Sequence, residues 1–299
     1  MKKLICILAV FIITNSIYAQ QDTVWRRGGL LALNFAQATL TNWAAGGQNS
    51  IAGNSIVNYF ANYKKGNDVW DTNLDLGYGL IMQGDKGKII KSDDKIDFSS
   101  KYGIKAFDHC YYSALINFRS QFTTGYNYPN DSVAISKLFA PAYLTFALGL
   151  DYKPTNYFSL FLSPATVRLI FVNDKSLSDA GAFGVTPGKT LRTEAGAFLR
   201  ATFKKDLNPI LNLQTALDLF GNYLDKPENI VVNWQMLLSL KVNKFLSASL
   251  SAQLIYDDNS KLTFYKSDGI TVDHAGPRTQ FKEVVGIGLA YKFSGVTVK

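Results

Sequence analysis

Residues 281–293 alternate between two kinds of side chain, and this alternation restricts the segment to a β-strand with two unlike faces. The even positions are small or charged. The odd positions are Phe281, Glu283, Val285, Ile287, Leu289, Tyr291 and Phe293. A period of two places successive side chains on opposite faces of a strand. Such a strand suits a soluble sandwich with its apolar face inward, or a membrane barrel with that face turned to lipid.

The same alternation recurs throughout the chain and predicts a protein built from long strands. Further segments with this pattern are 30–37, 56–64, 69–82, 96–105, 112–122, 142–152, 158–171, 191–204, 211–223, 232–243 and 246–257. Many of them exceed the usual strand length of about five or six residues. Pro164 interrupts the pattern of segment 158–171, and a proline cannot donate to a strand ladder, so we expect a bulge there.

The connections between these segments alternate in length. The short ones are 66–67, 107–109, 154–156, 206–209 and 243–245, and the long ones are 38–55, 83–94, 124–139, 172–190, 224–230 and 258–279. An even strand number with short turns at one rim and long loops at the other is typical of outer-membrane barrels. We therefore predict an all-β fold: a closed, antiparallel, up-and-down transmembrane barrel of about 12 strands with periplasmic turns and extracellular loops. A soluble sandwich or lipocalin-like barrel is the alternative.

The N-terminus has the pattern of a secretory signal peptide. Lys2 and Lys3 precede an apolar run from Leu4 to Ile13, and small and polar residues follow it. Residues 1–19 are therefore expected to be removed before Gln20, which leaves 20–299 as a single barrel domain in the outer membrane of a Gram-negative bacterium. No stretch of the mature chain is apolar for long enough to form a spanning helix.

The net charge of the chain restricts the kinds of partner that we expect. Loss of Lys2 and Lys3 lowers the formal charge from +8 to +6. An excess of basic residues is compatible with binding to nucleic acid or to a membrane surface. Because an exported chain encounters a membrane surface rather than nucleic acid, we expect no nucleic-acid binding. Outer-membrane lipid and small solutes are the expected partners, and no cofactor is expected.

Several short motifs occur along the chain, namely NWAAGGQNS at 42–50, NYKKG at 62–66, WD at 70–71, LGYG at 76–79, SDDKI at 92–96, NFR at 117–119, APAYL at 140–144, GAFGV at 181–185 and VNW at 232–234. As a set they resemble the DUF3078 family of Bacteroidota. The resemblance implies an uncharacterised outer-membrane barrel-like protein. It implies no activity.

Catalytic chemistry has little support in the sequence, because catalysis needs titratable groups gathered at one place. The predicted topology places His109 and His274 on opposite rims, so they cannot form one site. We expect no enzyme and no metal site. Asp71, Asp75 and Asp97 could bind a cation, but the nearby lysines favour salt bridges.

Charged residues on the predicted inner face are the candidate lining of a lumen. The set is Asp71, Asp75, Asp97, Lys101, Lys105, Arg119, Asp151, Arg168, Arg192, Glu194, Arg200, Asp218 and Lys241, with Lys204, Asp257, Lys282 and Lys292 on the same face. Basic residues outnumber acidic ones by three. The primary prediction is a narrow, mildly cationic pore for small polar or anionic solutes. The alternative is a closed barrel that serves as a structural or interaction component of envelope or secretion machinery.

The first long loop contains a separate candidate contact site. Trp43 stands close to the turn formed by Gly46 and Gly47. The segment could fold inward as a constriction, stand outward as a contact site, or simply make a turn.

Overall fold

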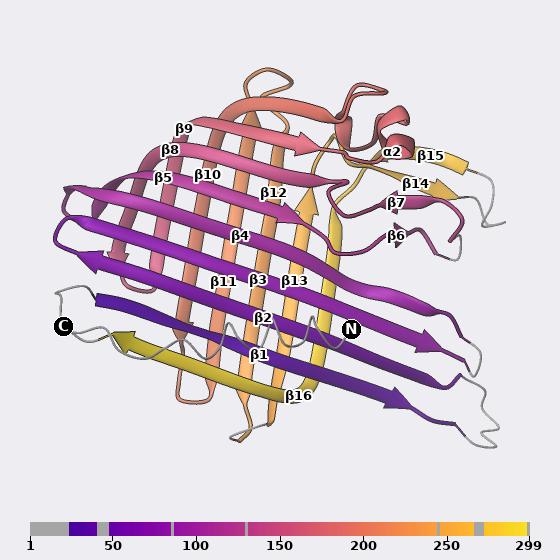
Figure 1. Cartoon of the computed structure of the whole chain (residues 1–299), viewed down its shortest axis with the longest axis horizontal. Helices are drawn as coiled ribbons and strands as arrows, with labels where there is room; N and C mark the ends of the chain where they lie inside the picture. Colours follow the sequence, from indigo (N-terminus) through magenta and orange to yellow (C-terminus); the bar gives the residue numbers. More distant parts are fainter. Residues whose placement is uncertain are drawn as a thin grey trace, which may run out of the picture.

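Long antiparallel strands form most of the described part of the protein (Figure 1). The computed structural model describes residues 24–40, 48–84, 87–128, 131–243, 246–265 and 272–297. The barrel strands in these ranges are β1 (Val24–Ala38), β2 (Ser50–Lys65), β3 (Asp68–Gln83), β4 (Ile89–Phe107), β5 (Cys110–Ser120), β8 (Ala142–Thr155), β9 (Phe158–Phe171), β10 (Leu191–Asp206), β11 (Leu211–Asn222), β12 (Ile230–Lys241), β13 (Leu246–Tyr256) and β16 (Gln280–Thr297).

The first and last strands pair and close the sheet. β1 lies antiparallel to β16 in a register that matches Phe35 with Ile287, and β1 pairs with β2 on its other edge. Each remaining barrel strand pairs antiparallel with its neighbours in chain order, and the strands close as β1-β16-β13-β12-β11-β10-β9-β8-β5-β4-β3-β2. The prediction of a closed, up-and-down barrel of twelve antiparallel strands is confirmed.

Side chains on the outer face are apolar and exposed. On β16, Val285, Ile287 and Leu289 are 69%, 61% and 59% exposed, and on β8 Leu148 is 64% exposed. The residue next to Leu148, Ala147, is buried in the interior. An apolar outer belt around a polar interior is the pattern of a transmembrane barrel, because closure leaves no unpaired edge in lipid.

The predicted bulge at Pro164 is present. The inward positions of β9 include Ser163 before the proline and Thr166 after it, so the alternation changes phase across this point. The register with β10 shifts between Gly196 and Phe198 at the same level. A strand with proline in the ladder adopts such an irregularity because the proline nitrogen has no hydrogen to donate.

The long connections contain folded elements that the sequence did not predict. They are β6 (Gly125–Tyr126), β7 (Ala134–Ser136), α2 (Lys175–Asp179), η1 (Ala182–Gly184), β14 (Lys261–Tyr265) and β15 (Val272–Pro277). Figure 1 shows them at one end of the barrel, beyond the strands. Such short elements depend on contacts between loops, which a local pattern does not reveal. Among the described residues, no helix is long and apolar enough to cross a membrane.

Two predictions concern parts of the chain outside the described residues. These are the signal peptide at 1–19 and the loop contact formed by Trp43, Gly46 and Gly47.

Candidate functional site: a side-chain network inside the barrel

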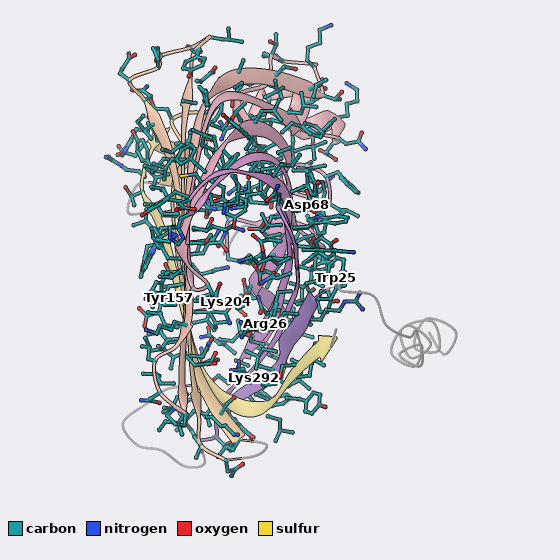
Figure 2. All side chains as sticks on the ribbon, turned by 90° about the vertical axis from the view of Figure 1, so that its left-hand side faces the viewer. Trp25, Arg26, Asp68, Tyr157, Lys204 and Lys292 are labelled. Carbon is teal, nitrogen blue, oxygen red and sulfur yellow. The ribbon has the colours of Figure 1, made fainter. Side chains whose placement is uncertain are left out.

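The centre of the barrel is crossed by hydrogen bonds between opposite strands. β4 and β12 are six strands apart in either direction around the closed sheet. Gln235 of β12 nevertheless donates from Nε2 to Asp97 Oδ2 of β4 over 3.1 Å, and Lys95 of β4 donates to Gln235 Oε1. These bonds join the two walls across the full width of the interior. Figure 2 shows the two walls facing each other with side chains between them.

Asp97 is further held on its own side of the barrel. Asn117 of β5 donates from Nδ2 to Asp97 Oδ1 over 2.8 Å, and Asp97 is only 9% exposed. A buried carboxylate costs several kcal/mol unless positive charge and hydrogen bonds compensate it. Lys95 and Arg119 contribute favourable charge at this position. The link between the walls is therefore part of a compensated network.

A bidentate ion pair extends this network. Arg200 of β10 and Asp218 of β11 are register partners. Arg200 donates from Nε over 2.6 Å and from a terminal nitrogen over 2.7 Å to the two Asp218 oxygens. Arg119 of β5 approaches the same carboxylate at 3.7 Å. A fork geometry of this kind fixes both partners more firmly than a single contact does.

A second ion-pair cluster lies toward the long-loop rim. Arg168 of β9 donates from Nε to Glu194 over 2.5 Å, and it lies 3.6 Å from Asp257, which follows β13. Arg192 reaches Glu194 at 2.9 Å and donates to Asn259 over 2.8 Å. Arg168 and Glu194 are almost completely buried. This cluster joins the barrel wall to the loops above it.

A third cluster lies nearer the short-turn rim. Lys101 of β4 is 2.8 Å from Asp151 of β8, and it donates to Ser159 of β9 over 2.7 Å. Lys153 lies 3.4 Å from Asp151 and also donates to Asp71 of β3. Lys153 was not among the predicted lining residues because the predicted strand ended at residue 152. Extending the alternation of that strand by one step would have found it.

Apolar side chains fill one side of the interior, which the sequence analysis did not predict. They are Leu115, Ala147, Phe161, Phe198 and Phe220, on five consecutive strands of the barrel. The guanidinium of Arg168 lies 4.4 Å from the Phe220 ring centroid, a cation–π distance. The sequence did contain one indication of this cluster: Phe198 and Phe220 stand at inward positions of strands whose inner face is otherwise polar.

The opposite side of the interior is packed as well. A Cβ added to Gly286 of β16 would lie 2.6 Å from Asn34 Cγ of β1, so only glycine fits at this approach. Asn34 donates to Ser249 of β13 over 3.3 Å. Lys282 of β16 reaches Asp93 of β4 at 2.5 Å. These polar contacts therefore join strands that are two and four positions apart around the sheet.

Most of the predicted lining residues take part in these clusters or in neighbouring contacts. Those that do are Asp71, Asp75, Asp97, Lys101, Arg119, Asp151, Arg168, Arg192, Glu194, Arg200 and Asp218. Two of the predicted lining residues lie outside these clusters. Lys105 and Lys241 are exposed, because they stand at strand ends on the short-turn rim, where solvent reaches them.

The two histidines and the inner acidic residues lie at separate places in the described structure. Among them, no group of three His, Cys, Asp or Glu side chains is placed to hold a metal ion. His109 lies in the short turn between β4 and β5, whereas His274 lies in β15 beside Asp273 at 2.8 Å. Asp71, Asp75 and Asp97 each have a separate polar partner.

These features define the class of the protein: a closed, twelve-stranded, antiparallel β-barrel with an apolar outer belt and an interior crossed by side-chain contacts. The family model described as "Protein of unknown function (DUF3078)" matches residues 35–126, which confirms over that segment the family predicted from the sequence. The segment is shorter than half of the chain. No curated protein matches this chain.

Several solved structures are similar to this chain at low sequence identity. One is the COG4313 outer membrane channel from Pseudomonas putida F1, with 9% identity, a TM-score of 0.36, and coverage of 94% of this chain and 98% of that one. Another is the translocator domain of the autotransporter NalP from Neisseria meningitidis, with 9% identity, a TM-score of 0.35, and coverage of 98% and 96%. A third is OmpT, an outer membrane protein of Vibrio cholerae, with 8% identity, a TM-score of 0.29, and coverage of 93% and 100%.

Proposed function

We propose that this protein is an outer-membrane barrel whose interior is closed by its own side chains, and that it presents folded extracellular loops to a partner in the envelope. The observation that carries the proposal is the link from Lys95 through Gln235 to Asp97, which joins opposite strands directly. A direct hydrogen bond leaves no place for water between its donor and acceptor. The role proposed is structural and does not involve catalysis.

Location in the outer membrane is supported by the outer belt. Leu148, Leu162 and Leu289 lie on three barrel strands and are each about half exposed or more. In water, this apolar surface would cost roughly 25 cal/mol for each Å². Lipid removes that cost, and only closed sheets satisfy every strand edge in lipid.

The loops are organised well enough to form a defined surface. Ala140, Val172, Leu177 and Val185 form a buried cluster around α2. Asp174 caps α2 by accepting a hydrogen bond of 3.1 Å from the Leu177 amide. A packed loop surface presents a partner with fixed groups and a small ordering cost.

Solute efflux from proteoliposomes tests the proposal. Vesicles that contain the wild-type protein should retain chloride and small neutral sugars as well as empty vesicles do. Gln235→Ala removes both bonds that Gln235 makes to the opposite wall without changing a charge, and it should increase leakage. Gln253→Ala is the matched control, because within the described residues the Gln253 amide donates to Asn233 on the adjacent strand, over 3.1 Å, and not to the opposite wall. Rapid efflux through the wild-type protein would contradict a closed interior.

A narrow, anion-preferring pore is the second candidate. It is favoured by the basic groups Arg26, Lys204 and Lys292, which lie on the inner face near the short-turn rim (Figure 2). A conducting path would have to pass beside the contact between Gln235 and Asp97. Efflux of chloride from wild-type vesicles, with slower efflux of cations, would favour this candidate over the closed barrel.

A further inference from the structure

Three basic side chains from distant parts of the sequence lie at the short-turn end of the barrel, close enough for the charges of Arg26 and Lys292 to act on Lys204. Arg26 is on β1, Lys204 on β10 and Lys292 on β16. Each has the inward parity of its strand, shown by the buried neighbours Gly28 and Ala32 on β1 and Arg200 on β10. Figure 2 places the three between the two walls of the barrel.

Lys204 extends across the barrel. Its Nζ lies 4.1 Å from the ring centroid of Phe60 on β2, and β2 and β10 are six strands apart in either direction. The Phe60 ring packs closely on Gly28, where an added Cβ would lie 2.8 Å from the ring. The glycine, the ring and the ammonium thus form a built platform, which holds the Lys204 charge in the interior.

Positive charge exceeds negative charge around this platform. In the described part of the chain, no carboxylate lies within 4.0 Å of the basic groups of Lys204 or Arg26. Lys292 is paired at 2.8 Å with Asp206, but both of these side chains are more than half exposed. Arg26 and Lys292 are also exposed at the rim. Asp75 is a second nearby carboxylate, and it acts on Lys204 from more than 4.0 Å away. Three cations therefore face two carboxylates in a place that solvent reaches.

We propose that Arg26, Lys204 and Lys292 form a binding site for a phosphate-type dianion at the short-turn mouth of the barrel. A guanidinium supplies a planar pair of donors, and two ammonium groups supply point charges, which is the combination that phosphate oxygens accept. A bound dianion would compensate the excess positive charge of these three side chains. The same group can reach the site as a free anion or as the headgroup of a lipid. This site is independent of whether the centre of the barrel is closed.

The strands offer a matched control for this site. Arg27 and Lys205 are the next residues on β1 and β10, and they point to the outer face, where Arg27 lies 5.0 Å from the Trp25 ring and Lys205 lies 4.4 Å from the Tyr157 ring. The double variant Arg26→Gln/Lys204→Gln removes two inward charges. The double variant Arg27→Gln/Lys205→Gln removes the same charges from the same strands on the other face.

Isothermal titration of the purified full-length protein in detergent tests the proposal, with pyrophosphate and water-soluble dihexanoyl phosphatidic acid as separate probes at constant chloride. We expect saturable binding of at least one probe. The inward double variant should bind it at least about tenfold more weakly, whereas the outward variant should stay within about twofold of the wild type.

The two probes distinguish the sources of the phosphate group. Tighter binding of pyrophosphate assigns the site to a free anion, and tighter binding of the short-chain lipid assigns it to a headgroup. The absence of binding of either probe, or equal weakening in the inward and outward variants, would overturn the proposal. Heat-modifiable mobility on electrophoresis checks that every variant is folded.

Discussion

Gln235 and Asp97 lie on opposite walls of the barrel, and the amide of Gln235 donates to the carboxylate of Asp97 over 3.1 Å. A twelve-stranded barrel is intermediate between small barrels filled by side chains and large barrels that hold a water channel. In this barrel, long polar side chains span the width and their charges compensate one another. The interior therefore resembles a packed polar core more than a channel.

Asp97→Ala should destabilise the barrel strongly. The change leaves the amides of Asn117 and Gln235 without their charged partner, and each hydrogen bond to a charged group contributes about 1.5–3 kcal/mol. Thermal unfolding in detergent, followed by the loss of β-sheet circular dichroism, measures the effect. Asp108→Ala is the control, since the Asp108 side chain is 94% exposed and its loss should change the midpoint by no more than about 1 °C. Equal midpoints for the two variants would exclude a structural role for Asp97.

The pair formed by Arg200 and Asp218 should show strong coupling. Arg200→Met or Asp218→Leu alone leaves a buried charge and should cost about 3–5 kcal/mol, whereas the double variant should be closer to the wild type than either single variant. Urea unfolding in lipid vesicles provides the three free energies of unfolding. Additive losses would show that the two side chains do not act as a pair.

Acid should loosen α2 through Asp174. The hydrogen bond from Lys137, followed by those from Ser176 and the Leu177 amide, holds the pKa of Asp174 well below its ordinary value of 3.8. A carboxyl with a lowered folded-state pKa stabilises the fold fully above that ordinary value, and the stabilisation is lost as pH falls toward the folded-state pKa. Amide hydrogen exchange of residues 175–180, corrected for intrinsic rates, should therefore show falling protection below about pH 4.

Asp174→Asn and Asp179→Asn provide the controls for this acid effect. Asp174→Asn should remove the pH dependence of protection in α2. Asp179→Asn should preserve it, because Asp179 pairs with Lys175 on the exposed side of the helix. A wild-type helix whose protection is constant down to about pH 2 would contradict the role given to Asp174.

A charge on the outer belt should impair insertion into the membrane. Leu148 on β8 and Val133 in a long loop have similar exposed fractions, 64% and 62%. Leu148→Arg should cost about 2–4 kcal/mol because its charge would face hydrocarbon, while Val133→Arg should have little effect. The fraction folded into vesicles, read from heat-modifiable mobility, measures both. Equal folding of the two variants would show that Leu148 does not face lipid.

The strands and their inner faces could be predicted from local alternation because a period of two depends only on neighbouring residues. Segment 158–171 agrees with β9 at both ends, and the bulge at Pro164 follows from the chemistry of proline. The contact between Gln235 and Asp97 could not be predicted this way. It depends on which strands face each other and on side-chain length, and neither is visible in a local pattern.

The interior apolar cluster likewise could not be predicted from a local pattern. Phe198 and Phe220 stand on faces that are otherwise polar, and each residue alone is compatible with a wide channel or a packed interior. The structure distinguishes these because Phe161 packs on Phe198 with 6.4 Å between ring centroids. The folded loop elements also depend on such contacts, so they were predicted only as connections.

Single-channel recording in a planar bilayer tests the central claim most directly. With the wild-type protein inserted, the current should stay at the baseline of the bare membrane across a range of voltages. Gln235→Ala should produce discrete openings, and Gln253→Ala should behave as the wild type does. Steady, ion-selective conductance through the wild-type protein would contradict a barrel closed by the contact between Gln235 and Asp97.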